Sequence, residues 1–440
     1  MSMRSTITFY ELWEEKPAWL TCNKCLFIQY IKYNLIYIYI MHKIWKYNKD
    51  ITDIQLSGNP EISFFSKVYR KHTQFGIQRV RMYDVQHGVQ NQINYHGDLI
   101  KSIDLEIRSI TFNHEDIPIP DNIGTTILGD ITLRTSNKPI EKLSGSYIEM
   151  YYQLNNPISL HSFYETIPSD YIEGNKVTCN TGSMFQKLTL SGGVFNLDNK
   201  ILGSDGVLDV ILPIPFSFAS ITSLSLPYLL FHLNNPLNIR FEIDTALVNT
   251  VYTKFNFIIN YIYLEEEEKQ RFKSSTNEYI IQKVEPCTIT LKNGILEYKI
   301  PPTYGNIKSI IWKNINNYYD YNISINNILV CRKNKSYHYW TKHNIKRYNL
   351  IGGGRKVSTD IKDRHIISDN SIAIYTFGLD DKKNDSPSGS VNSHKNKIAI
   401  IIDDTETTDT LQNYPDFTLY IISYNILTIT DGNIKLNYTN

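Results

Sequence analysis

The sequence lacks the charge excess of a protein that coats nucleic acid. Its 440 residues carry 45 Lys and Arg against 44 Asp and Glu, which leaves a formal net charge of +1. Proteins that bind nucleic acid usually have a large basic excess, because each phosphate that they neutralise needs a Lys or Arg. We therefore expect no direct contact with nucleic acid as the main task of this chain.

Cysteine is also scarce. The chain has five, an odd number, and they are widely spaced: Cys22, Cys25, Cys179, Cys287 and Cys331. This spacing does not suit a disulfide framework and favours a reducing compartment. The first two form a lone CxxC motif without the second pair of ligands that a structural zinc site needs. No metal and no cofactor is expected.

No apolar run has the length of a membrane span. The run LFIQYIKYNLIYIYIM at residues 26–41 is shorter than the roughly 20 residues of a spanning helix, and a lysine and an asparagine interrupt it. Acidic residues from Glu11 onward precede it, which argues against a cleavable signal peptide. We interpret residues 1–49 as an N-terminal extension. The apolar run within it could be a membrane-proximal anchor, a buried arm or translated sequence upstream of a start at Met41, and we favour the last two.

Motifs for catalysis and nucleotide binding are missing as well. Glycines 352–354 lack the spacing of a phosphate loop. Glu106, Glu165 and Asp209 could supply the two carboxylates of a glycosidase, but no local pattern pairs them. The histidines show no metal-type spacing. We therefore expect no enzyme activity and no small-molecule substrate.

The chain is rich in the pattern of short β-strands. It contains 32 Tyr, a residue that favours strands. The segments IDLEIR at residues 103–108 and LNIRFEID at residues 237–244 alternate apolar and polar side chains, which puts one face on a core and the other in water or against a neighbour. Further strand-like runs occupy 206–212, 255–263, 287–291, 309–312, 323–330, 372–379, 397–402 and 417–429. Many short strands separated by turns predict a sandwich or jelly roll.

One segment breaks this pattern. Residues 265–272 read EEEEKQRF, which is rich in helix formers and places acidic residues before basic ones, as the helix dipole favours. We expect a helical connector at residues 265–277. It would join a first jelly-roll domain at 50–264 to a second at 278–440, and the length of the chain suits two domains.

Residues 56–75, LSGNPEISFFSKVYRKHTQF, resemble the opening of the major capsid proteins of nucleocytoplasmic large DNA viruses. That family opens with a Thr-Gly-Asn-Pro turn, a Phe-Phe pair and a Tyr-Arg-Arg-His-Thr-Asn-Phe stretch. Segments at 212–229, 263–281 and 375–392 resemble the same family in the same order, so the resemblance spans about residues 50–440. The residues that carry it, which we expect to have structural roles, are Gly58, Asn59, Pro60, Phe64, Phe65, Tyr69, Arg70, His72, Phe75, Arg271, Phe272, Pro387, Ser388, Gly389 and Asn392.

The resemblance implies a fold and an assembly. The fold would be all-β, with two tandem eight-stranded antiparallel jelly rolls, a double jelly roll. Three copies would form a homotrimer with a pseudo-hexagonal outline, a capsomer that tiles an icosahedral virion shell. Implied partners are neighbouring capsomers, minor capsid proteins and an internal membrane layer, with assembly in the host cytoplasm. Phe272 would pack the connector helix on a jelly roll.

Two departures from the family leave a minor or divergent paralogue open. Residues 1–49 have no counterpart in the family, and the ending NIKLNYTN at 433–440 replaces a Met-Gly-Gly-Leu-Ala-Tyr-Ser-Asn type of ending. One alternative is a transient assembly scaffold of the same fold. A more distant one is a carbohydrate-binding β-sandwich protein, since sandwiches host many functions.

Overall fold

A computed structural model of the chain places one compact unit at Thr73–Asn440. The structure describes residues 72–113, 122–135, 138–155, 184–192, 208–289, 297–313, 320–329, 355–357, 366–368, 372–379, 386–403, 417–430 and 432–438. The N-terminal extension, the CxxC motif and the apolar run at 26–41 lie outside these residues. Within them, no helix combines the length and hydrophobicity that crossing a bilayer requires.

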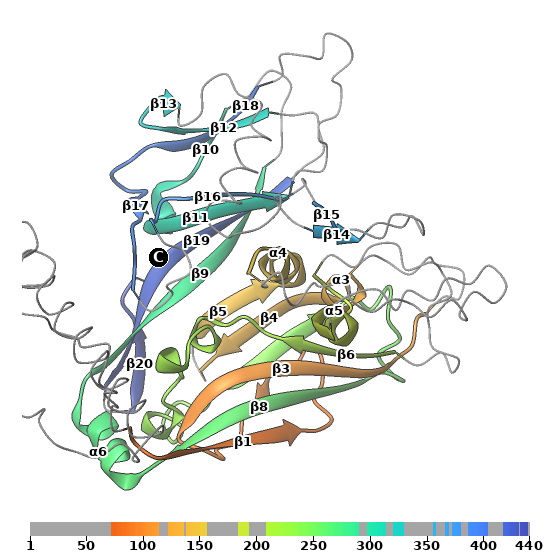
Figure 1. Cartoon of the computed structure of the whole chain (residues 1–440), viewed down its shortest axis with the longest axis vertical. Coiled ribbons are helices and arrows are strands. Elements are labelled where there is room, and N and C mark those ends of the chain that lie inside the picture. The colour runs from red at the N-terminus through yellow and green to blue at the C-terminus, as the bar shows by residue number, and fades with distance from the viewer. Residues whose placement is uncertain are drawn as a thin grey trace, which may run out of the picture. The chain divides into compact units, whose positions relative to one another are not determined.

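The first eight strands form two four-stranded antiparallel sheets (Figure 1). In spatial order, the first sheet contains β1 (Phe75–Met82), β8 (Lys254–Leu264), β3 (Leu99–Ile110) and β6 (Leu208–Pro213). The second contains β2 (Asn91–Gln92), β7 (Asn238–Ile243), β4 (Leu128–Arg134) and β5 (Pro139–Ser144). The orders 1-8-3-6 and 2-7-4-5 are those of a jelly roll, in which the chain crosses repeatedly between two sheets. We call this domain roll 1.

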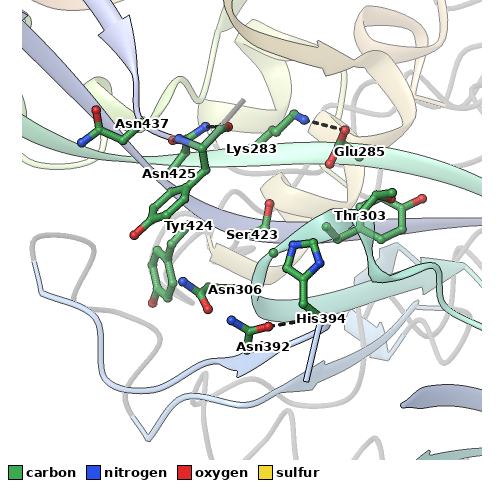
Figure 2. A pocket seen from close by; sticks show the side chains of 13 residues that line it. Lys283, Glu285, Thr303, Asn306, Asn392, His394, Ser423, Tyr424, Asn425 and Asn437 are labelled. Carbon is green, nitrogen blue, oxygen red and sulfur yellow. Dashed lines mark hydrogen bonds and ion pairs between the residues drawn. The ribbon is translucent and has the colours of Figure 1, made fainter. Parts of the chain in front are cut away.

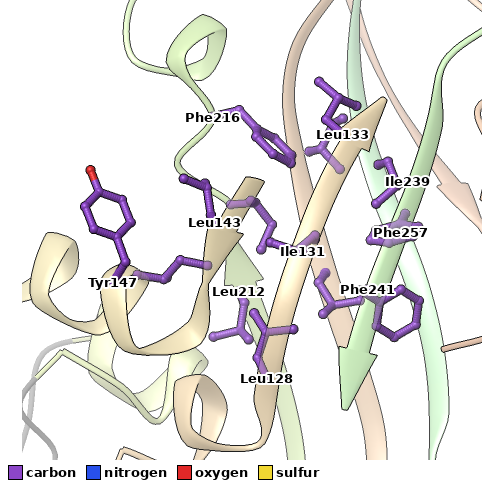
Figure 3. Packing of buried hydrophobic residues seen from close by; sticks show 14 of the residues in the cluster. Leu128, Ile131, Leu133, Leu143, Tyr147, Leu212, Phe216, Ile239, Phe241 and Phe257 are labelled. Atoms are coloured by element: carbon purple, nitrogen blue, oxygen red, sulfur yellow. The ribbon is translucent and has the colours of Figure 1, made fainter. Parts of the chain in front are cut away.

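The core of roll 1 lies between these two sheets. On β3, Ile103, Leu105 and Ile107 are fully buried while the alternate residues face away, as the period of two in the sequence predicts. Figure 3 shows how side chains of β4, β6, β7 and β8 meet there, with Phe241 edge-on to Phe257 at a centroid distance of 5.4 Å. Each such large apolar side chain stabilises the fold by about 1.5–3 kcal/mol.

Three short helices, which the sequence did not reveal, lie close together beside β4, β5 and β6 (Figure 1). They are α3 (Ile123–Thr126), α4 (Gly145–Asn155) and α5 (Met184–Thr189). These helices are additional to the helical connector expected at residues 265–277. Helix α4 contains three tyrosines and one isoleucine, residues that favour strands, and its helical state depends on tertiary contacts. The buried Glu149 of α4 accepts hydrogen bonds from Thr125 Oγ1 at 2.7 Å and from the backbone N–H of Gly192 at 3.0 Å.

We expect Gly145→Ala to lower the free energy of unfolding by about 3 kcal/mol, because overpacking a dense site costs roughly this much. A Cβ atom at Gly145 would clash with the backbone carbonyl oxygens of Leu128 and Thr125. Gly76→Ala on β1 is the matched control, since its Cβ would meet nothing nearer than 4.0 Å. Urea unfolding followed by circular dichroism measures both. Equal stability of the two variants would contradict the close approach of α4 to these carbonyls.

Helix α6 (Glu266–Ser274) follows β8 and precedes β9 (Asn277–Ile289). Its first turn is acidic and its last turn contains Arg271 and Lys273, which suits the helix dipole. Lys269 pairs with the buried Asp98 of roll 1 at 3.2 Å, and the Asn277 amide donates to the carbonyl of Phe272 at 2.8 Å. These contacts fix the direction in which the chain leaves roll 1.

The strands after α6 repeat the topology of roll 1. One sheet contains β9, β19 (Phe417–Thr430), β11 (Asn306–Lys313) and β16 (Ile372–Thr376). The other contains β10 (Glu297–Lys299), β18 (Ile398–Asp403), β12 (Asp320–Ile325) and β13 (Ile328–Leu329). Outside this repeat, β17 (Val391–Asn392) pairs with β11, β20 (Asn433–Leu436) pairs with β19, and β14 (Arg355–Val357) pairs with β15 (Ile366–Ser368). We call this domain roll 2.

Roll 2 has its own core between its two sheets, and Trp312 is its largest fully buried side chain. If its eight repeated strands are numbered in chain order, the two sheets again read 1-8-3-6 and 2-7-4-5. The predicted fold of two antiparallel eight-stranded jelly rolls joined by a short helix is confirmed.

Candidate functional site

The two rolls meet through an apolar contact that we call the seam. It joins the outer face of the β9-β19-β11-β16 sheet of roll 2 to β5, α4 and the 3-10 helix η3 (Ser217–Ala219) of roll 1. Tyr420 and Ile422 of β19 are buried in the seam, whereas Leu419 and Ile421 between them face the core of roll 2. Alternate residues of one strand therefore serve two different apolar clusters.

Polar contacts orient the seam. Tyr420 Oη accepts a hydrogen bond from Ser144 Oγ at 3.0 Å, and its ring lies 5.6 Å from that of Tyr147. The backbone N–H of Gln282 in β9 donates to Ser217 Oγ of η3 at 2.8 Å. Because hydrogen bonds are directional, these contacts restrict rotation of one roll against the other.

A buried carboxyl lies directly behind this contact. Glu141 of β5 is 4% exposed, and its Oε2 accepts a hydrogen bond from the backbone N–H of Ser217 at 2.9 Å. Its Oε1 is buried and has no hydrogen-bond partner among the described residues. Burial raises the pKa of Glu141 to about 7, although the bonds with Ser217 oppose this shift. A group beside the seam thus changes its charge near neutral pH.

The other end of the seam lies near α6. The Asn235 amide of roll 1 donates to the carbonyl of Gly432 in roll 2 at 2.8 Å. A hollow of about 430 Å³ lies here, lined by residues of both rolls and of the connector, among them Leu229, Phe272 and Ile429. Phe272 is half-buried against this hollow.

The outer face of the β1-β8-β3-β6 sheet corresponds by topology to the seam face of roll 2, but it is charged. Arg81 Nη2 lies 3.0 Å from Glu106 Oε1, and Arg79 Nη2 lies 3.6 Å from Asp104 Oδ2. The Glu106 side chain is only 5% exposed and also accepts from the Asn256 amide at 2.9 Å. Burial raises the pKa of Asp104 to about 6, against the lowering effect of Arg79. The carboxylates are thus largely withdrawn from water while the arginines reach outward.

The carboxylates considered for a glycosidase are engaged on this same face. Arg108 Nε lies 3.9 Å from Glu106 Oε1 and 3.8 Å from Asp209 Oδ2. Asp209 also accepts from the backbone N–H of Ser109 at 2.9 Å. Glu165 lies outside the described residues. Over the described part of the chain, no group of three His, Cys, Asp or Glu side chains could hold a metal ion.

A second hollow, of about 450 Å³, lies on roll 2 (Figure 2). Amides and tyrosines dominate its lining, together with an ion pair between Lys283 and Glu285 at 2.7 Å. Asn425 is bound to the segment after β20, because its Nδ2 donates to the Tyr438 carbonyl at 2.9 Å and its Oδ1 accepts from the Tyr438 N–H at 3.1 Å. These side chains hold the end of the described chain on β19.

The predicted motif residues fall into three groups. Gly58, Asn59, Pro60, Phe64, Phe65, Tyr69 and Arg70 lie outside the described residues. His72 and Phe75 are exposed near the start of the first described range, and Arg271 is exposed on α6. Pro387, Ser388 and Gly389 lie in one loop of roll 2, and Asn392 follows in β17. Phe272, half-buried on α6, stands apart from these groups. The structure does not gather these groups into one site.

The loop of roll 2 has a clear conformational role. Gly389 has a φ of 152°, and a Cβ there would lie 2.9 Å from the carbonyl oxygen of Phe377, which favours glycine. Asn392 Oδ1 accepts from the backbone N–H of His394 at 2.9 Å, and Asn392 pairs with Asn306 in the ladder of β17 and β11. The structural roles expected for the motif residues stay predictions.

The comparison with known proteins adds the decisive observation. Residues 63–265 match the family described as "Major capsid protein N-terminus". This part of the chain is therefore similar to the N-terminal region of major capsid proteins. It is 24% identical over 259 residues to capsid protein 1 of Acanthamoeba polyphaga mimivirus, a match that covers 53% of this chain and 41% of that protein. It is also 24% identical over 254 residues to the major capsid protein of Paramecium bursaria Chlorella virus 1, over 53% of this chain and 50% of that protein.

Solved capsid structures share the fold over most of this chain. A protein of the PBCV-1 virus capsid superposes with a TM-score of 0.60 at 16% identity, covering 86% of this chain and 100% of that one. The Faustovirus major capsid protein superposes with a TM-score of 0.55 at 8% identity, over 87% and 94%. The chain spans about half the length of the curated relatives it matches. The resemblance to major capsid proteins stated from the sequence is confirmed, and so is the fold.

Proposed function

We propose that this chain is a structural subunit of a virion shell, without catalytic activity, and that its copies associate as trimers. The supporting observation is the seam between two domains of like topology. In the seam, roll 1 uses β5, α4 and η3, whereas roll 2 uses its β9-β19-β11-β16 sheet. The contact is heterologous, because the two domains use different surfaces. A heterologous contact that is repeated from chain to chain forms a ring when its rotation closes.

Three copies with two rolls each would place six like domains around such a ring. This arrangement supports the pseudo-hexagonal capsomer that the family resemblance implies, with domain boundaries at 50–264, 265–277 and 278–440. The near-zero net charge is compatible with dense lateral packing, since strong like charge would oppose it. We propose neighbouring capsomers and minor capsid proteins as further partners, and assembly in the cytoplasm of the host.

The solution mass of the full chain tests this proposal. Size-exclusion chromatography with light scattering is expected to give a species of three times the 51.2 kDa subunit mass. Electron microscopy of that species should then show a pseudo-hexagonal outline. A folded monomer at micromolar concentration would contradict the trimer. Presence of the chain in immature particles but not in mature virions would favour the scaffold of the same fold.

A further inference from the structure

Because roll 2 repeats the topology of roll 1, the contact between the rolls within one chain indicates which strands of two copies would contact each other. In the seam, β9, the first strand of roll 2, packs against β5, the fifth strand of roll 1. The equivalent pair between two copies is β1, the first strand of roll 1, and β13, the fifth strand of roll 2. This correspondence rests on the proposed function, because it assumes that copies repeat the geometry of the seam.

Strand β1 has the properties of an uncovered contact surface. It lies at the edge of its sheet and pairs with β8 alone among the described strands. Its residues Val80 and Met82 pack on the core of roll 1, so Phe75, Ile77 and Arg79 point to the outer face. Phe75 is 59% exposed and Ile77 is 55% exposed. Exposed apolar residues on an open edge strand favour association with another chain.

Strand β13 shows the same property on roll 2. It is the last strand of its sheet and pairs with β12 among the described strands. Its Ile328 is 68% exposed. The two strands that the repeat makes equivalent to the buried pair β9 and β5 thus both carry exposed isoleucines. A contact between them would bury apolar surface that is in water in the single chain.

The charged residues beside β1 add a polar border to this surface. The Arg79 side chain is 57% exposed, and its distance of 3.6 Å from Asp104 is too long for a hydrogen bond. Arg108, 45% exposed, has similarly long distances to its two carboxylates. These guanidinium groups can therefore bind acceptors on a partner, as arginine commonly does at interfaces.

We propose that β1 of one copy docks against β13 of a second copy, with Ile77 and Ile328 in the apolar centre and Arg79 at the polar border. This contact differs from the seam inside the chain, which is mainly apolar and largely buried. The difference separates two steps: the seam forms as each chain folds, and the contact between copies forms afterwards between folded chains. Salt is expected to weaken the second step, because its border is ionic and accessible to solvent.

Two single substitutions in the full chain test the pairing. Ile77→Asp and Ile328→Asp should each weaken trimer formation at least about tenfold, since each places a charge in a buried apolar centre. Val251→Asp is the matched control, because Val251 is 84% exposed and lies outside the proposed contact. Light scattering over a concentration series measures assembly. Circular dichroism melting establishes that the three variants fold alike, as substitutions at exposed positions should.

The outcomes separate this inference from the proposed function. A wild-type chain that forms no trimer overturns the proposed function and this inference with it. Wild-type trimers together with Ile77→Asp and Ile328→Asp variants that assemble like Val251→Asp overturn the contact and leave the shell function standing. Loss of assembly in only one of the two variants overturns the pairing of β1 with β13. Equal loss in both, with assembly of the control intact, supports it.

Discussion

Glu141→Gln is expected to raise the free energy of unfolding at pH 8 by about 3 kcal/mol. The carboxyl has a pKa of about 7 in the folded chain, against an ordinary value of 4.5. The folded state therefore binds this proton more tightly than the unfolded state. The stability that the protonated group contributes is complete below about pH 4.5 and is lost as the pH rises to about 7. Glutamine keeps the shape of the side chain and cannot lose a proton.

Urea unfolding of both proteins between pH 5 and pH 8 measures this effect. The gap in stability should be small at pH 5, should widen up to about pH 7 and should stay constant above it. Glu242→Gln is the matched control in the same roll, because the Glu242 side chain is 51% exposed and pairs with Arg240 on the surface. A gap that does not change with pH would show that the Glu141 carboxyl is not neutral in the fold.

Ile422→Asp is expected to disrupt the seam and to cost about 4 kcal/mol or more, since it buries an unpaired charge in an apolar contact. Ile422 is 4% exposed and faces roll 1, while its neighbour Ile421 faces the core of roll 2. The substitution therefore places a charge at the contact between the rolls and not in the core of roll 2. We expect thermal unfolding to change from one transition to two, one for each roll.

Differential scanning calorimetry of the full chain measures the number of transitions. Leu233→Asp is the matched control, because Leu233 is 83% exposed and the same exchange there should leave a single transition at nearly the same temperature. A single transition in Ile422→Asp, with the midpoint of the wild type, would mean that the seam contributes little to the coupling of the rolls.

The sequence predicted those parts of the fold in which each strand has one buried and one solvated face. Burial alternates along β7, and the apolar residues Ile103, Leu105 and Ile107 of β3 all face the core. Helix α6 has acidic residues in its first turn and basic residues in its last turn, so local pattern and tertiary structure agree. Helix α4 was not predicted, because it is buried on several sides and so lacks a clear helical repeat of apolar residues. It also contains residues that favour strands. No local pattern marks Glu141 as a buried carboxyl, since its environment comes from η3, far along the chain.

The seam could not be predicted for a related reason. Strand β19 reads FTLYIISYNILTIT, apolar on both faces, which indicates burial but not which face meets which partner. Only the repeated topology assigns Tyr420 to the seam and Leu419 to the core of roll 2. The family resemblance gave the fold class without these contacts, because motifs record which residues recur and not what they touch.

The position of β19 in the chain has a consequence for synthesis on the ribosome. All eight strands of roll 1 have been made once Leu264 is joined, so this domain can fold while translation continues. Roll 2 cannot close until β19 arrives, because β19 lies between β9 and β11. A chain that ends before β19 would therefore leave β5 and α4 exposed to solvent, because roll 2 would not pack against them. Exposed apolar surface makes such a product a substrate for chaperones and proteases. Under the proposed function, incomplete chains would thus be kept out of the growing particle.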